Sequence, residues 1–171
     1  MTSFLHDAHP RLEAASVAFE DELETDAQAA PRSHQRVEAV RCRREQERLG
    51  CAISNLAHAR QILVETLEYA KERKAFGQAI GSFQHNKFKL AEMVTAIEVA
   101  EAYVDDCIEA HAEGRLSAVD AAKAKWWSAQ VQNEILDACV QLHGGYGYMN
   151  EYRVARAWRD ARVTKIWAGS N

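Results

Sequence analysis

The sequence predicts an all-α protein, an up-down domain of the four-helix-bundle type. Residues that break helices are scarce: the chain of 171 residues has two prolines, Pro10 and Pro31, and eight glycines. Apolar residues also recur every three or four positions through three long segments with short connections, the pattern of antiparallel amphipathic helices. Because no stretch alternates usefully between apolar and polar residues, no strand is predicted.

The first half of the chain is predicted to hold two helices. An acidic, helix-prone segment over residues 8–29 is interrupted at Pro31. A second helix is predicted over residues 37–74. Its apolar stripe consists of Leu49, Ile53, Leu56, Leu63 and Leu67. We therefore divide the chain into a helical leader of uncertain origin, residues 1–36, and a bundle, residues 37–171.

The stretch AFGQAIGSF interrupts the helical pattern, and a third helix is predicted over residues 83–112, with Gly114 just beyond its end. Its stripe consists of Phe83, Leu90, Val94, Ile97, Val104 and Ile108. Ser117 and Asp120 form a weak capping box for a fourth helix that reaches residue 142. Gly144 and Gly145 are expected to end it, and a short helix is predicted over residues 151–158.

Composition excludes several classes of protein. The formal net charge of −4 does not suggest a nucleic-acid partner. No apolar run approaches the roughly 18 residues that span a membrane, and the start of the chain shows no signal-peptide pattern. The four cysteines are scattered without a CxxC pair, which predicts reduced thiols, a cytoplasmic location and no metal site.

The segment HGGYGY, residues 143–148, is the most unusual stretch. Its glycines follow a helix, whereas those of a P-loop or a Rossmann turn open one. From periodicity alone, the segment is a helix C-cap with a tight turn. A glycine also allows another backbone or a flat ligand to come close. Both interpretations stay open at this level.

Two blocks together resemble the signature of acyl-CoA dehydrogenases. They are YAKERKAFGQAIGSFQHNKFKLAEM, residues 69–93, and QLHGGYGYMNEYRVARAWRDARVTKIWAGS, residues 141–170. The resemblance covers residues 47–171 and implies the C-terminal helical, flavin-binding domain of that family. It implies oxidation of an acyl-CoA thioester to the 2,3-enoyl-CoA. A carboxylate removes the α-proton and FAD accepts the β-hydride.

The resemblance also implies roles for individual residues. Arg73 matches an arginine that meets the FAD pyrophosphate, a task suited to a permanent cation with forked donors. Phe76 and Gln84 match positions that contact the flavin. The loop that touches the adenosine half is matched by Gln141, Gly144 and Gly145. In the family these contacts reach the FAD of a neighbouring subunit. A homo-oligomer, tetramer or dimer, or a hetero-oligomer with a related subunit, is therefore expected.

The usual catalytic base of the family is missing. In the stretch Trp167-Ala168-Gly169-Ser170, Ala168 stands where the family's Tyr-Glu-Gly-Thr motif has its glutamate. One branch, resembling the isovaleryl- and long-chain-specific enzymes, carries the glutamate in the first helix of this domain instead. Glu47 matches that position and is our candidate base. A surface glutamate paired with a nearby arginine is the alternative. Trp167 and Gly169 are expected to flank the acyl chain.

The chain departs from the family in length. The middle β-domain, which covers one face of the flavin, has no counterpart, and the chain stops at Asn171, before the family's usual final helix. We therefore expect a shortened dehydrogenase with low activity on its own. The alternative is a non-catalytic helical bundle, a remnant or partner subunit that retains the oligomerisation surface.

Overall fold

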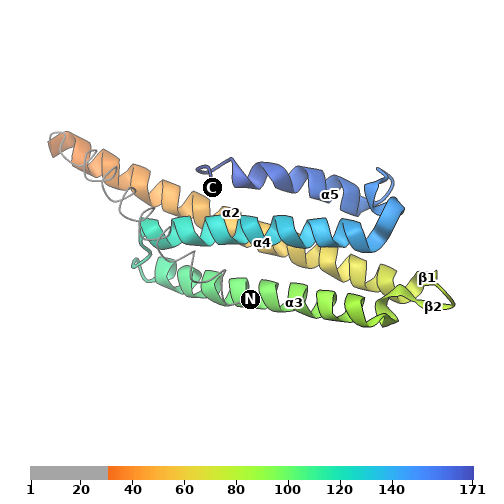
Figure 1. Ribbon diagram of the computed structural model, residues 1–171. Helices are drawn as coiled ribbons and strands as arrows, with labels where there is room; N and C mark the ends of the chain where they lie inside the picture. Colours follow the sequence, from red (N-terminus) through yellow and green to blue (C-terminus); the bar gives the residue numbers. More distant parts are fainter. Residues whose placement is uncertain (1–30) are drawn as a thin grey trace.

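The computed structural model describes the backbone of residues 31–171 and the side chains of Val40 and residues 43–171. Its helices are α2 (Pro31–Glu72), α3 (Gln84–Ala112), α4 (Ala118–His143) and α5 (Arg153–Ala161). Successive helices run in opposite directions, and α5 lies along α4 on the side away from α3 (Figure 1). The predicted all-α up-down bundle is confirmed. The predicted helix over residues 8–29 lies outside the described residues, and the boundary after residue 36 stays a prediction.

Helix α2 begins earlier than predicted. It starts at Pro31, six positions before the expected start at residue 37. Proline suits the first turn of a helix because its fixed φ is helical and the N–H it lacks would have no partner there. The helix ends at Glu72, where the Arg73 N–H still donates to Tyr69 O at 2.8 Å.

A small hairpin follows α2. Strands β1 (Lys74–Ala75) and β2 (Gln78–Ala79) pair antiparallel, with Lys74 opposite Ala79, and the 3-10 turn η1 (Ile80–Ser82) leads into α3. The sequence predicted no strand here. Strands of two residues are too short to show an alternating pattern, so the hairpin carries no signal of that kind.

The ends of α3 and α4 agree closely with the prediction. The Asp120 N–H donates to Ser117 Oγ at 3.0 Å, which confirms the cap of α4. Gly144 ends α4 with φ 60°, as a glycine can. The following segment is a 3-10 turn, η2 (Gly144–Tyr148), and η3 (Arg162–Lys165) follows α5.

The core lies mainly between α2 and α4, with Ile62, Ile97 and Leu136 among its largest fully buried side chains. Two predicted core positions are wrong, since Ile53 is 43% exposed and Ile108 38%. The buried face of α2 includes small and polar residues that an apolar count passes over. These are Ala52, Asn55, Ala59 and Thr66. The helix packs against its neighbours through these residues, and Ile53 lies outside that interface.

Candidate functional site

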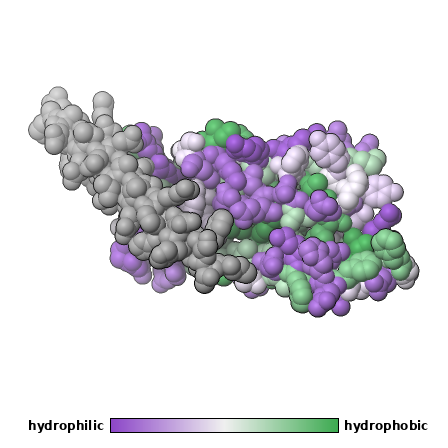
Figure 2. Space-filling view, in the orientation of Figure 1, coloured by the Kyte–Doolittle hydropathy of each residue, from purple (hydrophilic) through white to green (hydrophobic). Residues whose placement is uncertain are grey.

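The hairpin after α2 holds an aromatic ring in solvent. Phe76 and Gly77 form its two-residue loop, and both have positive φ, 52° and 82°. That conformation costs a residue with a side chain about 1–3 kcal/mol. Phe76 is nevertheless 96% exposed, and its ring meets Phe83 edge-on at 6.3 Å between centroids. The chain therefore presents Phe76 outward at the hairpin end of the bundle, where apolar and polar surface lie side by side (Figure 2).

Arg73 leaves α2 at the same end and contacts the glycine segment. Its guanidinium carbon lies 5.2 Å from the centroid of the Tyr146 ring. Tyr146 stacks on Tyr152 at 5.3 Å, and Tyr69 stacks on His143 at 4.1 Å. Tyr69 Oη also donates to the His143 carbonyl at 3.4 Å. This aromatic cluster fixes the end of α2 against η2.

The glycines of η2 differ in their surroundings. A Cβ added at Gly144 or Gly145 would meet no atom of the described residues within 4 Å, whereas one at Gly147 would lie 2.4 Å from Val140 O. Gly147 is therefore required by packing inside the chain. Gly144 ends the helix, which confirms the cap interpretation, and its N–H donates to Gln141 O. Nothing among the described residues requires Gly145 to lack a side chain, so room for an external group remains its explanation.

The predicted cofactor contacts thus lie at one end of the bundle. Gln84, the exposed first residue of α3, follows η1 directly. Gln141 is exposed near the end of α4. Both lie at the end where the hairpin and η2 meet (Figure 1).

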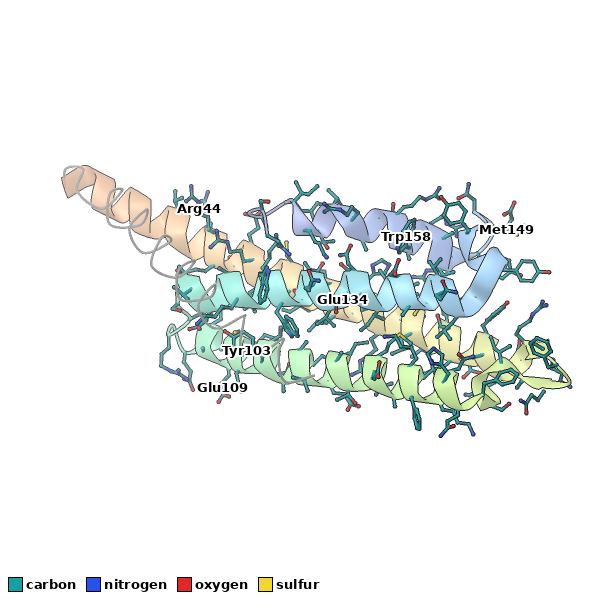
Figure 3. The ribbon with its side chains drawn as sticks, viewed as in Figure 1. Arg44, Tyr103, Glu109, Glu134, Met149 and Trp158 are labelled. Carbon is teal, nitrogen blue, oxygen red and sulfur yellow. The ribbon has the colours of Figure 1, made fainter. Side chains whose placement is uncertain are left out.

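Glu47 lies toward the opposite end, on the part of α2 that meets the end of the chain (Figure 1). Arg48 Nε donates to the Ala168 carbonyl at 3.4 Å, and a Cβ on Gly169 would lie 3.4 Å from the Arg48 guanidinium. Position 168 therefore lies against the turn of α2 that carries Glu47. Arg44 projects from the same stretch of α2 (Figure 3).

Glu47 is exposed. Its charge acts on two neighbours. It raises the pKa of Arg48, against the stronger lowering by burial, and it adds to the burial that raises the pKa of the Cys51 thiol. Both interpretations of Glu47, as catalytic base and as surface glutamate beside Arg48, stay predictions.

The segment after η3 carries the expected acyl-chain contacts. Trp167 is 51% exposed and Ile166 57%. Ala168 and Gly169 both have positive φ, 52° and 100°. The buried ammonium of Lys125 donates to the Gly169 carbonyl and, at 2.7 Å, to Asn171 Oδ1.

Sequence reasoning missed the residues that support these groups. Tyr69 is one of these residues. It lies four positions before Arg73, a spacing that brings side chains together on a helix, and this spacing was the available signal. Lys125 could have been noticed as a cation within the apolar face of α4. The stack of Tyr146 on Tyr152 depends on how η2 folds back, and no spacing of residues in the sequence indicates this.

Within the described residues, no group of three or more His, Cys, Asp or Glu side chains could hold a metal ion. None of the described helices is both long and apolar enough to cross a membrane.

The family model described as acyl-CoA dehydrogenase, C-terminal domain, matches residues 38–171. The chain belongs to the acyl-CoA dehydrogenase family. It is 45% identical over 126 residues to the mitochondrial long-chain specific acyl-CoA dehydrogenase of Sus scrofa, covering 74% of this chain and 29% of that protein. It thus spans less than a third of that dehydrogenase.

Two further relatives extend the likeness. The caffeyl-CoA reductase-Etf complex subunit CarC of Acetobacterium woodii is 40% identical over 124 residues, covering 72% of this chain and 33% of that protein. The structure of butyryl-CoA dehydrogenase from Megasphaera elsdenii matches with a TM-score of 0.73 and 40% identity, over 75% of this chain and 33% of that one. The predicted family and the helical fold are confirmed.

Proposed function

We propose that this chain supplies the C-terminal helical domain of a flavin-dependent acyl-CoA dehydrogenase, which oxidises an acyl-CoA thioester to the enoyl-CoA. The observation that carries the proposal is the contact between Arg48 and the Ala168 carbonyl at 3.4 Å. It brings together the two alternative positions of the family's glutamate. A carboxylate at Glu47 therefore lies near the region that a carboxylate at position 168 would serve.

The hairpin end of the bundle fits an FAD molecule, whose bound flavin would supply the hydride acceptor. Arg73 offers a permanent cation and forked donors to the pyrophosphate. Gly144 and Gly145 leave open space for the adenosine half, and Gln141 lies beside them on the last turn of α4. Phe76 and Gln84 present an exposed ring and an exposed amide to the flavin.

At the other end, we assign Glu47 as the base that takes the α-proton of the acyl group. The methyl group of Ala168 cannot accept a proton, whereas an exposed carboxylate one residue before Arg48 can. Trp167 and Gly169 flank the acyl chain in this proposal. The exposure of Trp167 and Ile166 offers apolar surface for such a chain.

The proposal requires more than one chain. Glu47 and Arg73 lie about 39 Å apart, because α2 rises about 1.5 Å per residue. A base must lie within hydrogen-bond reach of the proton that it abstracts, next to the flavin ring. The cofactor held by Arg73 is therefore not the one that serves Glu47 of the same chain. This geometry supports an oligomer, a tetramer or a dimer, in which each cofactor site is shared.

Flavin absorbance tests the proposal. The purified chain, alone or mixed with a related dehydrogenase subunit, should bind FAD and bleach when acyl-CoA is added. Glu47→Gln should slow this bleaching by about 10²–10⁴-fold, the usual contribution of a general base. Glu45→Gln, two residues earlier on the same helix, is the matched control and should bleach normally.

Two outcomes oppose the proposal. A chain that takes up no FAD in either setting, yet associates with itself or a related subunit, would favour a non-catalytic bundle. If flavin binds and Glu47→Gln bleaches like the unaltered chain, Glu47 is not the base.

A further inference from the structure

Lys125 is an unusual residue for the interior of a bundle. It lies in the first third of α4 and is 3% exposed. Its recorded hydrogen bonds go to two neutral oxygens, the Gly169 carbonyl and Asn171 Oδ1. Burial lowers the pKa of its ammonium, and the charge of Arg48 lowers it further. Burying a cation costs free energy unless it is well hydrogen-bonded. The two oxygens that accept from Lys125 offset part of that cost.

The oxygens belong to the C-terminal turn, which we define as residues 166–171. This turn has two successive residues of positive φ, one of which, Ala168, has a side chain. That conformation persists only where the surroundings hold it. The Asn171 N–H donates to Lys165 O at 2.9 Å, and Asn171 Nδ2 donates to Trp126 O at 3.3 Å.

Two cations from different helices thus meet adjacent carbonyls of the C-terminal turn. Arg48 of α2 donates to the Ala168 carbonyl, and Lys125 of α4 donates to that of Gly169. Hydrogen bonds from charged donors are about twice as strong as neutral ones. Lys125 also reaches the side chain that ends the turn. Lys125 therefore contacts the turn at two points, a backbone carbonyl and the Asn171 side chain.

We propose that Lys125 is a positioning residue that locks the C-terminal turn against α4 and so orients Trp167 and Gly169 toward the acyl group of the substrate. The locking of the turn follows from the contacts of Lys125. Its consequence for the acyl group rests on the proposed function. Lys125 touches neither base nor cofactor and acts through the turn.

Hydrogen exchange in the whole chain tests the lock without any ligand. The amide N–H groups of Trp167 and Asn171 in the turn donate to Val163 O and Lys165 O, just before it. Lys125→Met should speed their exchange about tenfold or more, as expected for loss of a hydrogen bond to a charged group. Amides in the middle of α3 should exchange as before. Global stability should not fall, because an apolar side chain of similar length replaces a buried charge.

Lys123→Met is the matched control, since Lys123 lies on the same helix and pairs with Asp120 at the surface. It should leave the turn amides unchanged. Asn171→Ala gives a second route if Lys125→Met does not fold, because it removes one acceptor without altering the core. It should speed exchange of the Trp167 amide about threefold. Unchanged exchange in the folded variants would overturn the lock.

The second arm uses octanoyl-CoA as the probe. Lys125→Met should weaken its binding, or raise its KM, about tenfold, while Lys123→Met should not. If the unaltered chain, both alone and mixed with a related dehydrogenase subunit, binds no acyl-CoA, the proposed function fails while the exchange data still decide the lock. If Lys125→Met loosens the turn but binds octanoyl-CoA normally, the orienting role of Lys125 is overturned and the proposed function stands.

Discussion

The guanidinium of Arg73 lies over the ring of Tyr146, with 5.2 Å between the guanidinium carbon and the ring centroid. The two residues are far apart in the sequence, yet Tyr69 of α2 stacks on His143 and meets Tyr152 edge-on, which brings η2 to the end of α2. A cation over an aromatic face is restrained by the ring's quadrupole. Arg73 is therefore held close to the glycines that are expected to receive the adenosine half of FAD.

Loss of the Tyr146 ring should weaken FAD binding through Arg73. We expect Tyr146→Leu to raise the Kd about two- to fivefold, the effect of an exposed cation–π contact of about 0.5–1 kcal/mol. Tyr146→Phe keeps the aromatic face and should bind normally. Tyr148→Leu, in the same turn, is the control. Equilibrium dialysis measures these values. In an Arg73→Ala background the Tyr146→Leu effect should vanish, and an additive effect would show that Tyr146 acts by another route.

Two neighbouring glycines should respond oppositely to alanine. Gly145→Ala adds a methyl group to open space, so its unfolding free energy should stay within about 0.5 kcal/mol while FAD affinity falls. Gly147→Ala places a methyl group against the Val140 carbonyl and should lose about 1–3 kcal/mol. Urea unfolding and FAD titration of both variants separate the effects. Equal stability of the two variants would contradict the packing described for Gly147.

Phe76 should matter to binding and little to folding. Its ring is 96% exposed and its φ is 52°, so Phe76→Gly removes strain while it adds freedom to the unfolded chain. We expect stability within about 1 kcal/mol of the unaltered chain, together with weaker FAD binding or assembly. Ile62→Ala, at a fully buried position, should instead cost about 2–5 kcal/mol. A large loss of stability in Phe76→Gly would argue for an internal role of the ring.

Acidification should destabilise the bundle through two histidines. Burial lowers the pKa of His143 and of His58, with the charge of Arg153 also lowering that of His58. Below the ordinary histidine pKa of about 6.5, the unfolded chain therefore binds protons before the folded one does. Stability is fully present above that pH and falls as the pH drops through the lowered values.

Urea unfolding at pH 7.5 and 5.5 measures this loss. His143→Phe keeps an aromatic ring against Tyr69 but removes one titrating group, so its loss between the two pH values should be smaller. His85→Phe, an exposed position, serves as control and should behave as the unaltered chain does. An identical loss in His143→Phe and the unaltered chain would exclude His143 as a cause.

Local signals in the sequence predicted much of the fold. Ser117 and Asp120 marked the start of α4, and Gly144 marked its end, because caps are made by residues next to each other in the chain. The long apolar periods predicted the bundle for the same reason. The start of α2 was not predicted, although Pro31 at its first position is a local signal. The buried face around Ala52 and Asn55 was not predicted either, since it depends on which neighbour the helix packs against.

The sequence by itself determined the family, the helices and the residues expected to hold cofactor and substrate. Only the tertiary structure decided where those residues lie. Residues 141–170 form one block in the sequence, yet α5 runs antiparallel to α4. Gln141 and Gly145 therefore lie at the hairpin end, and Trp167 lies toward the opposite end, near Arg48 (Figure 1). A helix has a fixed rise per residue. Long helices therefore separate residues that are close in the sequence, and their packing brings residues from distant parts of the sequence together. The contacts of Arg73 with Tyr146 and of Lys125 with Gly169 arise from that packing.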